Sequence, residues 1–313
     1  MRWRDMRGSG NVEDREGAGP PRGFGGAGFK LGGFGLVAVV AISLLLGLNP
    51  LDVIVSMQGG DVPTAPAPQS PSPQSPSVSP SAPSGARDET KEFVARVLGD
   101  TEDTWNKLFR DMQSQYRPPR LVLFRGGVES ACGMASAAVG PFYCPADQRV
   151  YLDRSFFEDL SKRFGAPGEF ARAYVIAHEI GHHVQNLMGI TDKVAQQRER
   201  AGGTRGNQLS VRLELQADCL AGVWGFYAKQ RGLLEPGDVE SGLGAAAAIG
   251  DDRLQRQTRG QVAPESFTHG SSEQRVRWFR TGLESGEPRR CDTFSAGAPL
   301  LTVSARPATP AAP

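Results

Sequence analysis

The segment His178-Glu179-Ile180-Gly181-His182 places two imidazoles four residues apart, with a carboxylate beside the first. Positions i and i+4 of an α-helix lie on one face, so both rings can reach a single metal ion. Glu179 stands to the side of that face, badly placed as a ligand but close enough to take a proton from a metal-bound water. This H-E-x-x-H arrangement is typical of zinc-dependent hydrolysis, in which the histidines hold the metal and the glutamate is the general base.

The alternative is a core helix whose histidines only pack or hydrogen-bond. The chain has four histidines, and three of them lie within six residues, at positions 178, 182 and 183. Apolar residues recur at helical spacing between Pro167 and Gly189, which predicts a buried helix. His183 lies about 100° round the helix from His182, so we expect it to be a hydrogen-bonded neighbour rather than a ligand.

A catalytic zinc usually has three protein ligands and one open position for water. The metzincin continuation is excluded, because Gln185 and Met188 stand where it requires a glycine and a histidine. A second apolar segment carries Glu214 and Asp218 on one helical face, and buried carboxylates need a cationic partner. We therefore expect Glu214 to be the third ligand of one Zn²⁺, and Asp218 to orient a liganding imidazole. Asp218 is the competing ligand, and two solvated acids on an amphipathic helix are the alternative to both roles.

Further motifs extend over nearly the whole chain. They are Met1-Arg2-Trp3, residues 11–15, Gly140-Pro141-Phe142-Tyr143-Cys144-Pro145, residues 178–185, residues 214–218, residues 249–255 and residues 267–272. With these motifs the chain resembles the neutral zinc metallopeptidase family of bacterial membrane-anchored proteins, a gluzincin-like family with H-E-x-x-H. The resemblance implies zinc as the cofactor and a protein or peptide as the substrate.

The remaining histidine, His269, stands just before a predicted helix start, where Ser271 and Gln274 match a capping box. This position favours a structural role. The functional alternative is a catalytic one, in which His269 donates a hydrogen bond to the oxyanion of the tetrahedral intermediate. The resemblance to the family brings this alternative level with the first. For Asp251 we expect helix capping or ion pairing.

The composition changes sharply along the first part of the chain. Residues 1–30 are rich in Gly and Arg and are predicted to form a disordered cytoplasmic leader. Residues 31–57 are predicted to form a transmembrane anchor, because the charge-free run from Leu31 to Leu51 is long enough to span a bilayer as one helix. A cleaved signal peptide is the alternative, but no small-residue cleavage site follows Leu48. Basic residues precede the run and Asp52 and Asp61 follow it, so the positive-inside rule predicts a cytoplasmic N-terminus and an extracytoplasmic domain at the cell membrane.

The rest of the chain divides into three parts. Residues 58–86 are predicted to be a Pro- and Ser-rich linker, residues 87–295 a single zinc metallopeptidase domain, and residues 296–313 a disordered tail. The net charge of +1 and the lack of a basic patch argue against a nucleic-acid partner. The expected partners are a protein or peptide substrate and the lipid bilayer.

All four cysteines lie in the predicted domain. Four cysteines allow three connectivities, and we favour Cys132 with Cys144 and Cys219 with Cys291. The second bond would fasten the C-terminal segment to the helix that carries Glu214. Zinc binding by cysteine is the competing idea, but the chain contains no C-x-x-C pair. Disulfides agree with an oxidising exterior.

The predicted fold class is α+β: a mostly helical zincin-like domain with a small sheet, after one transmembrane helix and a disordered linker. Helices are expected at residues 88–98, 101–115, 155–164, 167–188, 210–231, 239–257 and 271–283, and strands at residues 120–124 and 149–152. The expected function is that of a membrane-anchored zinc endopeptidase. The alternatives are a non-catalytic, zinc-stabilised interaction module of the cell envelope and a zinc amidase that acts on cell-wall material.

Overall fold

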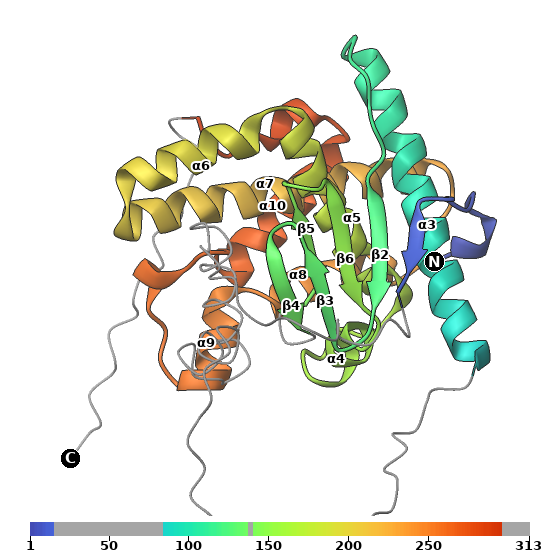
Figure 1. Ribbon diagram of the computed structural model, residues 1–313, viewed down its shortest axis with the longest axis horizontal. Helices are drawn as coiled ribbons and strands as arrows, with labels where there is room; N and C mark the ends of the chain where they lie inside the picture. The colour runs from blue at the N-terminus through green and yellow to red at the C-terminus, as the bar shows by residue number, and fades with distance from the viewer. Residues whose placement is uncertain (16–83, 137–139, 296–313) are drawn as a thin grey trace, which may run out of the picture. The chain divides into compact units, whose positions relative to one another are not determined.

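A computed structural model describes residues 1–15, 84–136 and 140–295 of the chain (Figure 1). The chain divides into two compact units, Met1–Arg163 and Phe164–Pro313. This differs from the single domain predicted for residues 87–295, because the first unit includes the N-terminus and the division falls at Arg163. The predicted anchor, the linker up to residue 83 and the tail lie outside the described residues. Within the described ranges, no helix is both long enough and apolar enough to cross a membrane.

The first unit contains a mixed sheet in the order β1-β2-β6-β5. β1 (Val12–Asp14), β2 (Arg120–Phe124) and β6 (Arg149–Asp153) run parallel, and β5 (Phe142–Cys144) is antiparallel to β6. β3 (Gly127–Ser130) and β4 (Gly133–Ser136) form a separate antiparallel hairpin. The two predicted strands are confirmed as β2 and β6.

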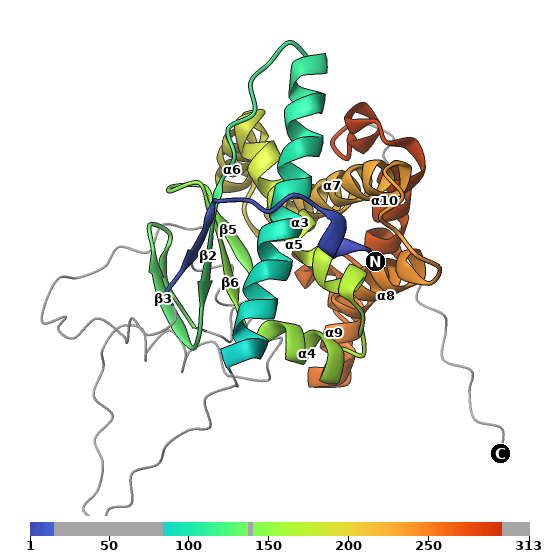
Figure 2. The same ribbon diagram turned by 90° about the vertical axis from the view of Figure 1, so that its right-hand side faces the viewer.

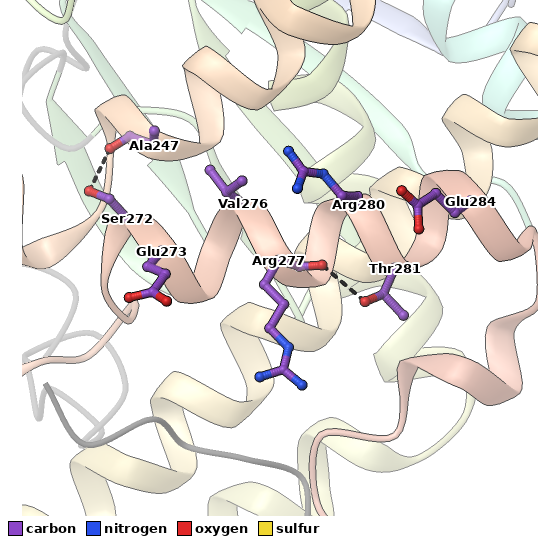
Figure 3. A pocket seen from close by; sticks show the side chains of 8 residues that line it. All are labelled: Ala247, Ser272, Glu273, Val276, Arg277, Arg280, Thr281 and Glu284. Carbon is purple, nitrogen blue, oxygen red and sulfur yellow. Dashed lines mark hydrogen bonds between the residues drawn. The ribbon is translucent and has the colours of Figure 1, made fainter.

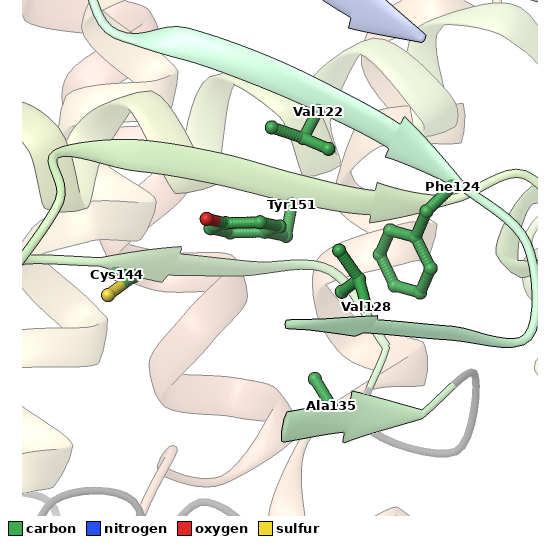
Figure 4. Packing of buried hydrophobic residues seen from close by; sticks show 6 residues of the cluster. All are labelled: Val122, Phe124, Val128, Ala135, Cys144 and Tyr151. Atoms are coloured by element: carbon green, nitrogen blue, oxygen red, sulfur yellow. The ribbon is translucent and has the colours of Figure 1, made fainter. Parts of the chain in front are cut away.

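One face of the sheet packs against the hairpin through a cluster of buried side chains. Because successive side chains of a strand point to opposite faces, Val122 and Phe124 lie on one side of β2 and Leu121 and Leu123 on the other. The cluster consists of Val122, Phe124, Val128, Ala135, Cys144 and Tyr151 (Figure 4). The predicted disulfide between Cys132 and Cys144 is confirmed, and it ties the turn of the hairpin to β5.

Two helices complete the first unit. α3 (Ser84–Asp111) is one continuous helix where two were predicted, and α4 (Phe156–Lys162) follows β6. Residues 1–15 form the 3₁₀ turn η1 (Trp3–Asp5) and then β1, so for these residues the prediction of a disordered leader is wrong. The composition is misleading here, because three of the few apolar residues of this segment, Met1, Trp3 and Met6, are buried.

The second unit is helical. It consists of α5 (Glu169–Leu187), α6 (Ile190–Ala201), α7 (Gly203–Gln230), α8 (Asp238–Ala248), α9 (Asp251–Arg259), η3 (Pro264–Ser266), α10 (Ser272–Ser285) and η4 (Pro288–Cys291). The helix predicted at residues 239–257 is two helices, since the chain breaks at Ile249 and Gly250 before Asp251. The predicted capping box of Ser271 and Gln274 is present at the start of α10. The mostly helical α+β class is thus confirmed.

Glycines allow α5, α7 and α10 to approach each other closely. A Cβ added at Gly181 of α5 would lie 2.8 Å from the carbonyl oxygen of Ala217 on α7. A Cβ added at Gly222 of α7 or Gly282 of α10 would collide with the backbone of the facing helix. No side chain can move aside to relieve such contacts, so these positions fix the spacing of the three helices.

We expect Gly282→Ala to destabilise the second unit by about 3 kcal/mol or more, because α10 must move away from the Cys219 carbonyl. The matched control is Gly244→Ala on α8, where no atom lies within 4 Å of the added Cβ. There the higher helix propensity of alanine is expected to stabilise by about 0.5–1 kcal/mol. Denaturant unfolding measures both, and equal stability of the two variants would contradict the close packing.

Candidate metal centre

His178, His182 and Glu214 converge in the second unit. One ligand atom from each can be chosen so that all three lie within 4.8 Å of one another, and no other group of three or more such residues is found in the described ranges. The His178 Nε2 lies 3.2 Å from His182 Nε2 and 3.2 Å from Glu214 Oε2. His182 Nε2 lies 3.5 Å from Glu214 Oε1. The two residues of α5 and the acid of α7 therefore meet as the sequence analysis predicts.

These separations fit one small cation. Two nitrogens bound tetrahedrally to zinc at about 2.05 Å lie roughly 3.3 Å apart, close to the spacing observed between the three groups. The outer nitrogen of each ring is occupied elsewhere, so both Nε2 atoms are left for a metal. The donor set of two imidazoles and one carboxylate is that of a catalytic zinc with an open fourth position.

Asp218 orients the first histidine. Its side chain is fully buried, and its Oδ1 accepts a hydrogen bond from His178 Nδ1 at 2.9 Å. The same carboxylate accepts hydrogen bonds from Tyr174 Oη and, at 2.9 Å, from Nε and Nη2 of Arg275 on α10. Burial raises the pKa of Asp218, but the charges of Arg275 and His178 outweigh it and hold the pKa below its usual value. Burial likewise lowers the pKa of His178, yet Asp218 raises it to about 10.

Gln185 orients the second histidine. His182 Nδ1 donates to Gln185 Oε1 at 2.9 Å, and the Gln185 amide nitrogen donates to the Leu213 carbonyl at 2.7 Å and to Gln216 Oε1 at 3.1 Å. Gln185 is fully buried between α5 and α7. One histidine is therefore held by a carboxylate and the other by a neutral amide, and in each case the contact at Nδ1 orients the ring with Nε2 toward the other two candidate ligands.

Glu214 and Glu179 differ in their electrostatics. Burial works against ionisation of Glu214, but the charges of His182 and His269 hold its pKa well below the usual value. Glu179 is 7% exposed, and burial raises its pKa even though His178 and His182 oppose the effect. A ligand must stay ionised, whereas a general base works best with a pKa nearer neutrality. The lowered pKa therefore suits Glu214 to metal binding, and the raised pKa suits Glu179 to proton transfer.

His269 is held by Asp251, for which the sequence predicts only helix capping or ion pairing. Asp251 Oδ1 lies 3.3 Å from His269 Nδ1, while Oδ2 accepts the backbone N–H groups of Thr268, His269 and Gly270. The loop rests on α7, because a Cβ added at Gly270 would lie 3.2 Å from Leu215. Burial lowers the pKa of His269, but the charges of Asp251 and Glu214 outweigh this effect and raise the pKa above its usual value.

The predicted disulfide between Cys219 and Cys291 is confirmed, and it fastens η4 to α7. Gln216, which contacts Gln185, donates to the Cys291 carbonyl at 2.9 Å. Thr293 Oγ1 donates to the Arg212 carbonyl at 2.6 Å. His183 is buried but is not part of the converging group. No cysteine is a candidate ligand, because all four are disulfide-bonded.

An open pocket lies along the outer face of α10, beside Ala247 of α8 (Figure 3). The pocket is lined by Val276, Arg277 and Arg280 together with Glu273 and Glu284. At one end, Ser272 Oγ donates a hydrogen bond to the Ala247 carbonyl. None of the converging residues lines this pocket, and its charges are of both signs. We therefore assign the chemistry to the converging histidines and carboxylates.

Fold and site together define a class: an α+β protein whose H-E-x-x-H helix and a second helix supply two imidazoles and a carboxylate to one point. The comparison with protein families agrees. A family model described as "Putative neutral zinc metallopeptidase" matches residues 1–294, and the chain belongs to this family. Zinc is the metal that the family implies.

The chain is also similar in sequence to individual proteins of other bacteria. It is 47% identical to "Uncharacterized protein YpfJ" of Escherichia coli (strain K12) over 296 residues, which are 94% of this chain and 99% of that protein. It is 45% identical to "Uncharacterized protein Rv2575" of Mycobacterium tuberculosis over 219 residues, which are 66% of this chain and 73% of that protein. No solved structure matches the chain.

We expect Gln185→Leu and Asp218→Asn each to lower zinc affinity about 10- to 100-fold, because a liganding imidazole loses its fixed orientation. Gln208→Leu, at an exposed position of α7, is the matched control and is expected to bind zinc normally. Competition with a chromophoric chelator measures the affinity. Wild-type affinity in both variants, with helical content preserved, would show that these contacts do not position the ligands.

Proposed function

We propose that the protein is a zinc-dependent endopeptidase that hydrolyses peptide bonds with an activated water and Glu179 as the general base. The observation that supports this most is that ligand atoms of His178, His182 and Glu214 lie within 4.8 Å of one another, close enough to share one cation. A buried carboxylate of raised pKa beside that point supplies the base. We propose one zinc ion per chain.

Each residue of the candidate site has a separate role in the proposed hydrolysis. His178, His182 and Glu214 would hold the zinc ion, which when bound would supply Lewis acidity to lower the pKa of water toward about 7 and to polarise the peptide carbonyl. Glu179 accepts the proton of the attacking water and delivers it to the leaving amine. His269, oriented by Asp251, donates a hydrogen bond to the oxyanion of the tetrahedral intermediate.

We further propose that the enzyme acts outside the cytoplasm, at the membrane. Two disulfides suit an oxidising compartment. The charge-free run of residues 31–51 supports attachment to lipid. In this setting the substrate is a protein or peptide of the cell envelope.

Incubating the full-length chain with an unfolded protein tests the function. Cleavage that stops with a zinc chelator and returns on adding zinc is the expected result. Bound zinc without cleavage of any substrate favours an interaction module of the cell envelope. Release of cell-wall fragments alone favours an amidase, and either result overturns the proposed peptidase.

We expect Glu179→Gln to keep its zinc and to lose about 10²- to 10⁴-fold in turnover, since the amide cannot accept the proton. His178→Ala is expected to lose both zinc and activity. The matched control is Glu199→Gln, the same change at an exposed position of α6. Metal analysis and peptide cleavage are measured side by side, and near-normal turnover of Glu179→Gln would remove the base assignment.

We expect His269→Gln to lower kcat by about 10²- to 10³-fold with little change in zinc content or KM, because the donor acts on the transition state. Asp251→Asn is expected to lower kcat because it disturbs the same histidine. The double variant is therefore expected to have a kcat close to that of His269→Gln alone. Independent, additive losses would show that Asp251 acts by another route. An unchanged kcat for His269→Gln would leave His269 a structural residue.

A further inference from the structure

Residues 1–15 are joined to the first unit by main-chain hydrogen bonds. β1 pairs in parallel with β2, with Val12 opposite Leu121 and Asp14 opposite Leu123. The ladder continues at both ends, since Leu121 N donates to the Asn11 carbonyl and Arg15 N to the Leu123 carbonyl, both at 2.9 Å. In Figure 2, β1 is the blue strand beside β2, and the chain before it runs along α3.

Apolar packing anchors the start of this segment. Trp3 is 2% exposed, and its ring meets Phe93 of α3 edge to face, with 5.4 Å between the centroids. The Arg96 guanidinium of α3 donates to the carbonyls of Arg4 and Met6 at 2.7 and 2.8 Å. A Cβ added at Gly99 of α3 would collide with the Arg7 carbonyl. The lack of a side chain at Gly99 therefore allows the backbone of residues 1–15 to contact α3 directly.

A buried carboxylate depends on the same segment. Glu102 of α3 is 4% exposed and receives hydrogen bonds from Arg7 Nη2 at 2.9 Å, Ser9 Oγ at 2.6 Å and Asn11 Nδ2 at 2.7 Å. All three donors belong to residues 1–15. A carboxylate left buried without donors is costly, so the first unit requires these residues in place.

This pairing restricts how the chain can meet a membrane. Hydrogen bonds of 2.9 Å cannot reach across a hydrocarbon core about 30 Å thick, so β1 and β2 lie on the same side. The charge-free run from Leu31 to Leu51 lies between them in sequence. It suffices for one helical crossing of about 20 residues, but a crossing and a return need about 40. One crossing would put β1 and β2 on opposite sides. Pairing of β2 with the β1 strand of a second copy would not remove this restriction, because the N-terminus of every copy lies on the same side of the membrane.

We propose that residues 1–15 and the first unit lie on the same side of the membrane, so that the sequence joining β1 to α3 makes no net crossing. This arrangement replaces the single crossing with a cytoplasmic N-terminus that the positive-inside rule predicts. The Cys132–Cys144 disulfide of the same unit assigns the shared compartment to the oxidising side.

Thiol labelling of the full-length protein in its own membranes tests the topology. The native cysteines are all disulfide-bonded, so an introduced thiol is the reactive one. Gly10→Cys reports on the N-terminal segment and Ser114→Cys on the residues after α3; both positions are exposed, and no atom lies within 4 Å of a Cβ at Gly10. With a membrane-impermeant maleimide added to spheroplasts, we expect both thiols to be labelled equally before lysis. Labelling of Ser114→Cys alone before lysis would overturn the proposal. Equal labelling of both only after lysis would keep the shared side but overturn its assignment to the oxidising compartment.

Two further variants separate topology from folding. Trp3→Ala is expected to lower the unfolding midpoint by about 5–15 °C, whereas Arg2→Ala, at a position whose side chain is 59% exposed, is expected to change it little. An unchanged midpoint for Trp3→Ala would show that the segment is not packed against α3.

Discussion

The buried carboxylate of Asp218 is the constraint on which the candidate site depends. It lies on α7 and joins Tyr174 and His178 of α5 to Arg275 of α10. An ionised group is stable in such a place only when its partners are present, since an unpaired buried charge costs several kcal/mol. The orientation of the His178 ring and the positions of three helices are therefore set together. A change in any one of them affects the metal ligands.

Rigid surroundings support this constraint. The helices approach each other at glycines, so their spacing follows from backbone contact rather than from adjustable side chains. The Cys219–Cys291 bond holds the C-terminal segment against α7, and Gln216 connects that segment to Gln185 and His182. Both the charged and the neutral support of the histidines thus come from ordered elements, as a preorganised site requires. His269 is the exception, since it lies on a loop, but Asp251 fixes that loop through three backbone N–H groups.

The sequence predicted those features that depend on local periodicity. Spacing of four residues on a helix placed the paired histidines, and Glu214 with Asp218, on common faces before any tertiary contact was known. It did not predict Gln185, because the role of that amide exists only once α5 and α7 lie together. Asp251 was missed because the turn at Gly250, which aims its carboxylate at the loop of His269, interrupts an otherwise helical pattern. Residues 1–15 were missed because their partners lie more than 80 positions away in sequence.

The proposed zinc site consists of two histidines of α5 and one glutamate of α7. X-ray absorption at the zinc edge of the purified full-length protein, together with metal analysis, distinguishes this site from others. We expect one zinc per chain, two imidazole nitrogens and carboxylate or water oxygens at about 2.0–2.2 Å, and no sulfur near 2.3 Å. A sulfur shell, or a zinc environment unchanged by Glu214→Ala, would contradict the proposed site.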